Sequence, residues 1–279
     1  VYVTENQMKL FYEFTAEQLK RIASSDKISE TERAVKRETA VRQLLSSVFA
    51  NADDGDSLES GRKMMEECNE IVKAFVSKPT DQPSTWLERM MAASSEGSST
   101  YSRAGNTATF STLLSIAFGI GNPKDVATAA LLHDIGLADV PAGISLKPES
   151  ERSREETQKY QEHPFHSVNI IKERKMIVSD DVLKIIEQHH ERFDGAGYPK
   201  RLAAGRMLQE AQLVAIADML EDITETKPGV ARVTIPQAIR MICDRGMSNP
   251  AAAPVDPEIL RNLRRIFLEP LETQKQQKG

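Results

Sequence analysis

Histidine and carboxylate side chains concentrate in one part of this chain. All five histidines fall between residues 133 and 190, as a His-Asp pair, a His-Pro-Phe-His run and a His-His-Glu run. Imidazole nitrogens and carboxylate oxygens are common protein ligands of transition metals, manganese among them. Each histidine group stands beside Asp, Glu or Pro. The clustering therefore predicts a metal site.

The His133-Asp134 pair and Asp218 suggest how such a site could hold more than one ion. On consecutive helix positions two side chains point about 100° apart, so both can reach one ion. The carboxylate of Asp134 could also bridge to a second ion about 3.5 to 4 Å from the first. Asp218 lies in an apolar Ala-Ile-Ala-Asp-Met-Leu run, where a carboxylate needs a partner. If Asp218 stood alone, a helix cap or a salt bridge would be enough to pair it. Beside a His-Asp pair and a His-His pair, a metal is favoured instead.

The elements that must position these residues are predicted to be helices. Aromatic residues make up only 5% of the chain, and residues that favour helices dominate. Residues 137–147 and 195–206 are expected to be loops. Residues 1–95 are expected to form an N-terminal helical segment with a regulatory or dimerisation role, and residues 96–279 a catalytic-type domain. Within that domain, apolar periodicity predicts helices over 106–118, 124–134, 163–174, 180–190, 209–226, 235–245 and 257–268. The expected fold is all-α.

Composition narrows the class of protein. The net charge of -5 argues against binding of a nucleic-acid polymer. No apolar run approaches the roughly 18 to 20 residues that a membrane helix needs, so no membrane partner is expected. The only two cysteines, Cys68 and Cys243, are far apart and form no metal or redox motif, which favours a reducing compartment and hence a cytoplasmic location.

Four motifs together resemble the HD-GYP family, a branch of the HD metal-dependent phosphohydrolases. They occur in the family's order and at about its spacing, and the resemblance covers roughly residues 99–268. The motifs are Leu131-Leu-His-Asp-Ile-Gly136, the His163-Pro pair, His189-His-Glu-Arg-Phe-Asp-Gly-Ala-Gly-Tyr-Pro199, and Asp218 within Ile-Ala-Asp.

The resemblance implies a helical domain that uses two divalent metal ions to hydrolyse the 3′,5′ phosphodiester bonds of cyclic di-GMP. The ions would be iron, with manganese as the alternative, and Asp134 would be both the bridge between them and a catalytic residue. By the same resemblance the metal ligands are His133, Asp134, His163, His189, His190 and Asp218.

Several further residues have two interpretations each. Glu191 and Asp194 could be catalytic and move protons, or could bind backbone amides and nearby Arg192 at a helix end. His166, one turn after His163, could be a ligand or a packing residue. The Gly197-Tyr198-Pro199 loop could contact a partner protein, or Tyr198 could pack beneath it. The N-terminal helices could form a homodimer. Residues expected to hold substrate phosphates are Arg192, Lys227 and Arg232.

Three departures from the family pattern leave a second function open. Arg103 stands where the family has a histidine, so a third metal is not expected. Leu137 replaces the family's lysine, and Val230 replaces the last basic residue of an Arg-Pro-Tyr-Arg run. Each missing charge should weaken transition-state stabilisation by a few kcal/mol. The alternative to a phosphodiesterase is therefore a weakly active or inactive HD-GYP protein that binds nucleotide or partner proteins in signalling.

Overall fold

The described part of the chain is built from helices. The computed structural model describes residues 100–225 and 231–269. These residues contain no strand, only an isolated bridge between Asp194 and Ala203, so the predicted all-α fold is confirmed for them. The α-helices are α6 (Thr100–Phe118), α7 (Pro123–Leu132), α8 (Ala142–Ser145), α9 (Arg154–Gln161), α10 (His163–Glu173), α11 (Asp180–Gln188), α12 (Gln209–Thr224), α13 (Ile235–Ser248) and α14 (Pro257–Phe267).

Some sequence predictions lie outside the described residues. These are the N-terminal helical segment over residues 1–95, its role in dimerisation, and the positions of Lys227 and Val230. The division of the chain near residue 95 stays a prediction. Within the described ranges, no helix is long and apolar enough to cross a membrane.

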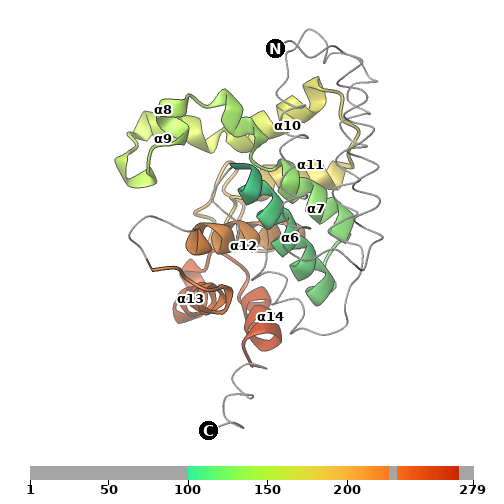
Figure 1. Cartoon of the computed structure of the whole chain (residues 1–279), viewed down its shortest axis with the longest axis vertical. Helices are drawn as coiled ribbons and strands as arrows, with labels where there is room; N and C mark the ends of the chain where they lie inside the picture. Colours follow the sequence, from blue (N-terminus) through green and yellow to red (C-terminus); the bar gives the residue numbers. More distant parts are fainter. Residues whose placement is uncertain (1–99, 226–230, 270–279) are drawn as a thin grey trace.

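Helices α6 and α12 lie at the centre of the fold and contribute to two hydrophobic clusters (Figure 1). One cluster packs them against α7, α10 and α11, and the other packs them against α13 and α14. Residues 106–115 of α6 are buried on every side. Several of its hydroxyl groups bond within the helix: Ser111 donates to the Thr107 carbonyl at 2.8 Å and Thr112 to the Ala108 carbonyl at 2.6 Å. The central helix can thus be buried despite its polar residues.

The chain leaves α7 just where the His-Asp pair begins, so the predicted helix through Asp134 was too long by two residues. The Ser167 hydroxyl of α10 donates to the His133 carbonyl at 2.6 Å and accepts the Gly136 amide at 2.8 Å. These bonds draw the chain out of the helix into a 3-10 turn, Ile135–Asp139. The loop predicted over 137–147 was also partly wrong, because this turn and α8 occupy most of it.

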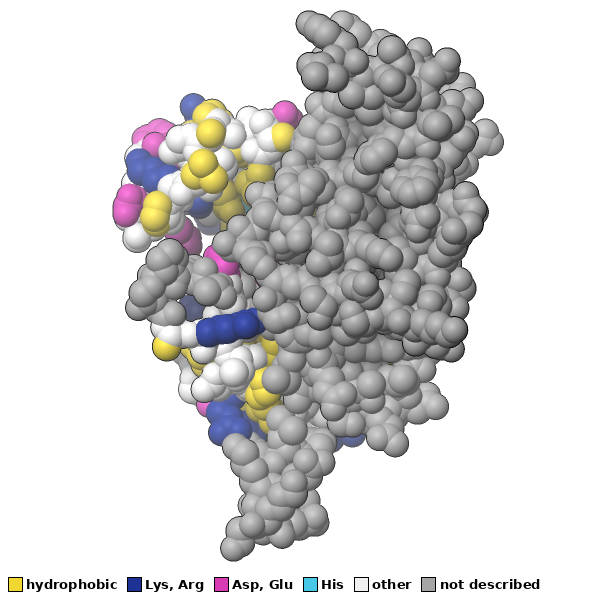
Figure 2. All heavy atoms as spheres, viewed as in Figure 1, with side chains coloured by type: hydrophobic (Ala, Val, Ile, Leu, Met, Phe, Trp, Pro, Cys, Tyr) yellow, Lys and Arg dark blue, Asp and Glu magenta, His cyan; other side chains and the backbone are white. Residues whose placement is uncertain are grey.

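Helices α8 and α9 project from the body of the fold and expose a mixture of hydrophobic, basic and acidic side chains (Figures 1 and 2). A capping box between Ser153 and Glu156 starts α9. The guanidinium of Arg152 lies 3.6 Å from the centroid of the Tyr160 ring. The capping box fixes the start of α9, the Arg152–Tyr160 contact lies at its end, and only Glu162 separates α9 from His163 at the start of α10.

A buried polar contact joins α6 to α12. The Asn106 side-chain amide donates to Glu221 Oε1 at 3.2 Å, and both side chains are almost fully buried. Burial raises the pKa of Glu221 to about 7, because the desolvation of the charged carboxylate outweighs the Asn106 hydrogen bond and the nearby Arg103 charge.

We expect Gly136→Ala to destabilise the fold by about 1 to 3 kcal/mol, the usual cost of forcing extra atoms into a packed interior. A Cβ at this position would collide with the backbone of His163 and Ser167. Gly143→Ala in α8 is the matched control, because a Cβ there meets nothing within 4 Å. Urea denaturation measures both variants, and equal stabilities would contradict the close packing of the turn on α10.

We expect Glu221→Gln to change how stability depends on pH. The folded-state pKa of Glu221 is raised, so its favourable contribution is present below about pH 4.5 and is lost as pH rises through about 7. The variant should therefore gain on the wild type by up to about 3 kcal/mol between pH 4.5 and 8. Denaturation across that range provides the measurement. A stability difference between Glu221→Gln and the wild type that stays constant across this range would refute the assignment.

Candidate metal centre

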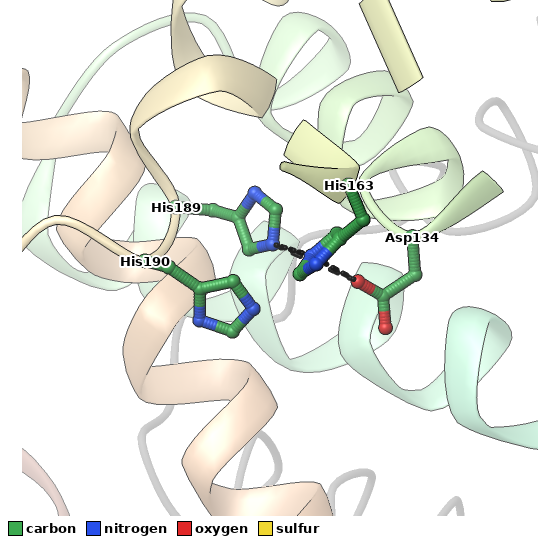
Figure 3. Close-up of side chains that lie close together, drawn as sticks. All are labelled: Asp134, His163, His189 and His190. Atoms are coloured by element: carbon green, nitrogen blue, oxygen red, sulfur yellow. Dashed lines mark hydrogen bonds and ion pairs between the residues drawn. The ribbon is translucent and has the colours of Figure 1, made fainter. Parts of the chain in front are cut away.

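Four of the predicted ligands converge from three parts of the fold (Figure 3). Asp134, His163, His189 and His190 each offer a ligand atom, and these atoms lie within 4.8 Å of one another. The Nε2 atom of His163 lies 3.2 Å from Asp134 Oδ1 and 3.4 Å from His189 Nε2. Asp134 follows α7, His163 opens α10, and the two adjacent histidines follow α11. The structure thus brings together residues separated by up to 56 positions (190 minus 134).

A second group of ligands shares Asp134 with the first. His133, Asp134 and Asp218 also offer ligand atoms that lie within 4.8 Å of one another. Asp134 Oδ1 faces His163, whereas Asp134 Oδ2 lies 3.3 Å from His133 Nε2. Asp218 Oδ1 lies 3.7 Å from the same nitrogen. The two oxygens of one carboxylate therefore face two different groups, which is the arrangement of a bridging ligand.

Three of the imidazole rings are oriented by the same type of hydrogen bond. The Nδ1 atom of each lies within hydrogen-bond distance of the carbonyl three residues earlier: His133 to Ala130 at 2.7 Å, His163 to Tyr160 at 2.8 Å, and His189 to Ile186 at 2.5 Å. A carbonyl oxygen only accepts, so Nδ1 carries a proton in each ring, and in the neutral form of the ring the lone pair lies on Nε2. Such contacts fix the ring and tautomer of metal-binding histidines. In the neutral ring each Nε2 atom is thereby available to a cation, and at His133 that cation would replace a proton.

The donor atoms fit a divalent metal. His133 Nε2 and Asp134 Oδ1 are buried, and neither has a hydrogen-bond partner among the residues that the structure describes. Buried polar atoms without a partner are costly and rare. A cation in each group would give both atoms a partner. Imidazole and carboxylate ligands suit iron, manganese and zinc, so the residues agree with the predicted metal chemistry but do not select one element.

The protonation states of the site also suit a cation. Burial, followed by the neighbouring imidazoles, lowers the pKa of His190 well below its usual value, and burial lowers that of His189. Both rings are therefore neutral near pH 7, the form that binds metals. Burial would also lower the pKa of His133, but the Asp134 and Asp218 carboxylates outweigh it and raise the value to about 10. The surplus negative charge that holds this proton would equally attract a metal ion.

Arg103 approaches the second group from α6. Its Nη2 atom donates to Asp218 Oδ1 at 2.7 Å. The Coulomb attraction of Asp218 outweighs burial and raises the pKa of Arg103 above its already high value, so the guanidinium is charged. The salt bridge that was the alternative for Asp218 is thus present beside the metal-ligand geometry, and both use the same carboxylate.

The two carboxylates after α11 hold the following loop. Glu191 is 2% exposed and accepts the amides of Lys200 at 2.6 Å and Leu202 at 2.8 Å. Asp194 accepts two bonds from Arg192 and one from the Ala196 amide. These contacts agree with the structural interpretation of both acids. Their part in proton transfer, and that of Arg192 in substrate binding, stay predictions.

The remaining predicted residues lie in varied surroundings. The Tyr198 ring packs 4.7 Å from the His190 ring, measured between centroids, and is only partly exposed, which agrees with packing beneath the loop. Gly197 is buried against the backbone of His190, and Pro199 follows Tyr198 through a cis peptide bond. His166 faces Asp139 at 3.9 Å and belongs to neither ligand group, and Arg232 is exposed before α13.

Sequence reasoning missed the residues that support the ligands. Ser167 connects α10 to the His-Asp turn, and the Tyr160 carbonyl orients His163. A histidine that follows a helix end by one or two residues is the signal that could have pointed to the carbonyl contacts. No pattern in the sequence marks Ser167.

Comparisons with known proteins agree with this site. The family model described as HD domain matches residues 75–249. The cyclic di-GMP phosphodiesterase response regulator RpfG of Xanthomonas campestris is 30% identical over 103 residues, which cover 37% of this chain and 27% of that protein. The 3'3'-cGAMP-specific phosphodiesterase 2 of Vibrio cholerae is 31% identical over 96 residues, which cover 34% of this chain and 18% of that protein. The chain thus spans less than a third of the length of either relative.

A solved structure has the same fold. Bd1817, described as an HDG"Y"P protein from Bdellovibrio bacteriovorus, superposes with a TM-score of 0.64 at 20% sequence identity, over 94% of this chain and 79% of that one. The family match covers more than half of the chain, and it includes all six predicted ligands. The chain therefore belongs to the HD domain family.

Proposed function

We propose that this chain is a metal-dependent phosphodiesterase that hydrolyses the 3′,5′ phosphodiester bonds of cyclic di-GMP. The observation that carries the proposal is the pair of ligand groups sharing Asp134. Divalent ions bound there, iron or manganese, would polarise the phosphoryl oxygens and supply a nucleophile from water at neutral pH. Curated relatives that carry the name cyclic di-GMP phosphodiesterase support this substrate. We place the reaction in the cytoplasm.

The residues of the chain would perform separate tasks. His163, His189 and His190 would hold one ion, His133 and Asp218 the other, and Asp134 would join them. The hydrogen bonds to helix-end carbonyls keep the Nε2 atoms aimed at the centre before any ion binds, so little rotamer freedom is lost on binding. Arg192, Arg232 and Lys227 are the proposed phosphate contacts.

The identity of the nucleotide substrate is the most specific part of the proposal. One relative is named for 3'3'-cGAMP, which differs from cyclic di-GMP in one base and has the same two phosphodiester links. The metal ligands act on the phosphodiester, which is common to both. Hydrolysis of the two nucleotides should therefore be measured side by side, and a clear preference for cyclic di-GMP would support the assignment.

Asp134→Ala should abolish hydrolysis and remove bound metal. Loss of a shared ligand should lower metal affinity by at least about 10- to 100-fold and activity by at least about 100-fold. The assay uses protein purified without oxygen, with metal counted by mass spectrometry and products separated by chromatography. Asp139→Ala is the control, because Asp139 lies on the same turn but in neither ligand group. Two bound ions with no product from the wild type would instead support the nucleotide- or partner-binding alternative.

Leu137→Lys should raise the rate of hydrolysis. Leu137 lies in the 3-10 turn directly after Asp134, and its amide donates to the Asp134 carbonyl at 3.0 Å. A cation at this place would add stabilisation of a phosphate, and one such contact commonly changes the rate by about 10² to 10³-fold. Leu137→Met is the uncharged control of similar size. A rate unchanged by lysine would show that the missing charge does not limit the reaction.

A further inference from the structure

The two ligand groups differ in their contacts with basic side chains: among the residues that the structure describes, an arginine pairs with Asp218 of the second group, whereas no lysine or arginine pairs with the first. Arg103 Nη2 lies 2.7 Å from Asp218 Oδ1, and this oxygen is the one that faces His133 Nε2 at 3.7 Å. The guanidinium therefore occupies the oxygen that an ion in the second position would use. Its side chain is 30% exposed, so it lies at the edge of the group rather than deep beneath it.

The first group carries no such competitor. Among the described residues, its four side chains contact one another, backbone carbonyl groups, His133 and the rings of Tyr160 and Tyr198, and no lysine or arginine forms an ion pair with them. An ion entering the first position displaces no positively charged group.

An ion in the second position must share Asp218 with Arg103 or take its place. Like charges repel strongly at a few ångströms in a partly buried site. A second acceptor for Arg103 already stands one turn further along α12. Asp222 Oδ1 lies 4.0 Å from Arg103 Nη1, and its side chain is 62% exposed. Rotation of the guanidinium toward Asp222 would release Asp218 without leaving the arginine unpaired.

We propose that the two metal positions fill in order, and that Arg103 gates the second by holding Asp218 until its guanidinium moves to Asp222. This inference rests on the metal centre of the proposed function but concerns binding alone. It predicts one ion bound tightly by Asp134, His163, His189 and His190, and a second bound more weakly by His133, Asp134 and Asp218. It also makes occupancy of the second position dependent on metal supply.

The test is a titration of metal-free protein with Mn²⁺. Free Mn²⁺ is followed by electron paramagnetic resonance, which counts bound ions without substrate. The wild type should bind one ion tightly and a second at least about tenfold more weakly, a gap of about 1.4 kcal/mol or more. Arg103→Gln keeps a hydrogen-bonding side chain without the charge, so its second constant should tighten at least about tenfold while the first changes little.

Three further variants separate gating from a general effect on folding. Arg103→Lys keeps the charge and should preserve the gap between the two constants. Asp222→Asn removes the alternative acceptor and should weaken the second ion further. Arg264→Gln, in an arginine–aspartate pair between α13 and α14, should change neither constant.

Two equal constants in the wild type would overturn the gate, as would an unchanged second constant in Arg103→Gln protein whose circular dichroism is native. Failure of a folded wild type to bind Mn²⁺ would overturn it too. Failure of the proposed function gives a different result: the two-step titration would remain, but cyclic di-GMP would not be hydrolysed when both positions are filled.

Discussion

The site depends on one partly buried carboxylate that faces two sets of donors at once. Asp134 can do this because the chain leaves α7 immediately before it and enters a turn fastened to α10. The Ser167 hydroxyl joins the His133 carbonyl to the Gly136 amide, and Gly136 gives the turn room against the α10 backbone. Had the helix continued, Asp134 would have been placed by helix geometry alone. The short turn instead directs one oxygen to each ligand group.

The hydrogen bonds of three histidines serve both the helix ends and the imidazole rings. The last carbonyls of a helix have no partner within that helix. His133, His163 and His189 each follow such an end, and each donates Nδ1–H to a last-turn carbonyl, of α7, α9 and α11 respectively. The hydrogen bond gives the helix-end carbonyl a donor, and it fixes the orientation and the tautomer of the imidazole ring. Three of the candidate metal ligands are thus held in place by the ends of helices.

Composition predicted the helical class, and the resemblance of four motifs to a known family singled out six candidate ligands, which the fold brings together in two groups. The sequence did not predict where α7 stops, since a Ser167 contact 34 residues away determines that. Nor could it pair Arg103 with Asp218 or Asn106 with Glu221. Each of those pairs spans 115 positions and forms only because α6 packs against α12. The residue types in the sequence determine which side chains can bind a metal. Helix packing determines which other charged or polar side chains contact them.

Arg103 bears on both functions left open by the sequence. A departure at a family position usually argues for lost activity, yet every ligand of both groups remains in place here. A guanidinium on Asp218 reconciles the two facts, because it balances a partly buried carboxylate when the second ion is absent and can be displaced when that ion is abundant. In water-poor surroundings an unbalanced Asp218 would be costly. Arg103 would therefore weaken ion binding at the second position and, when that ion is absent, keep Asp218 paired in the folded chain.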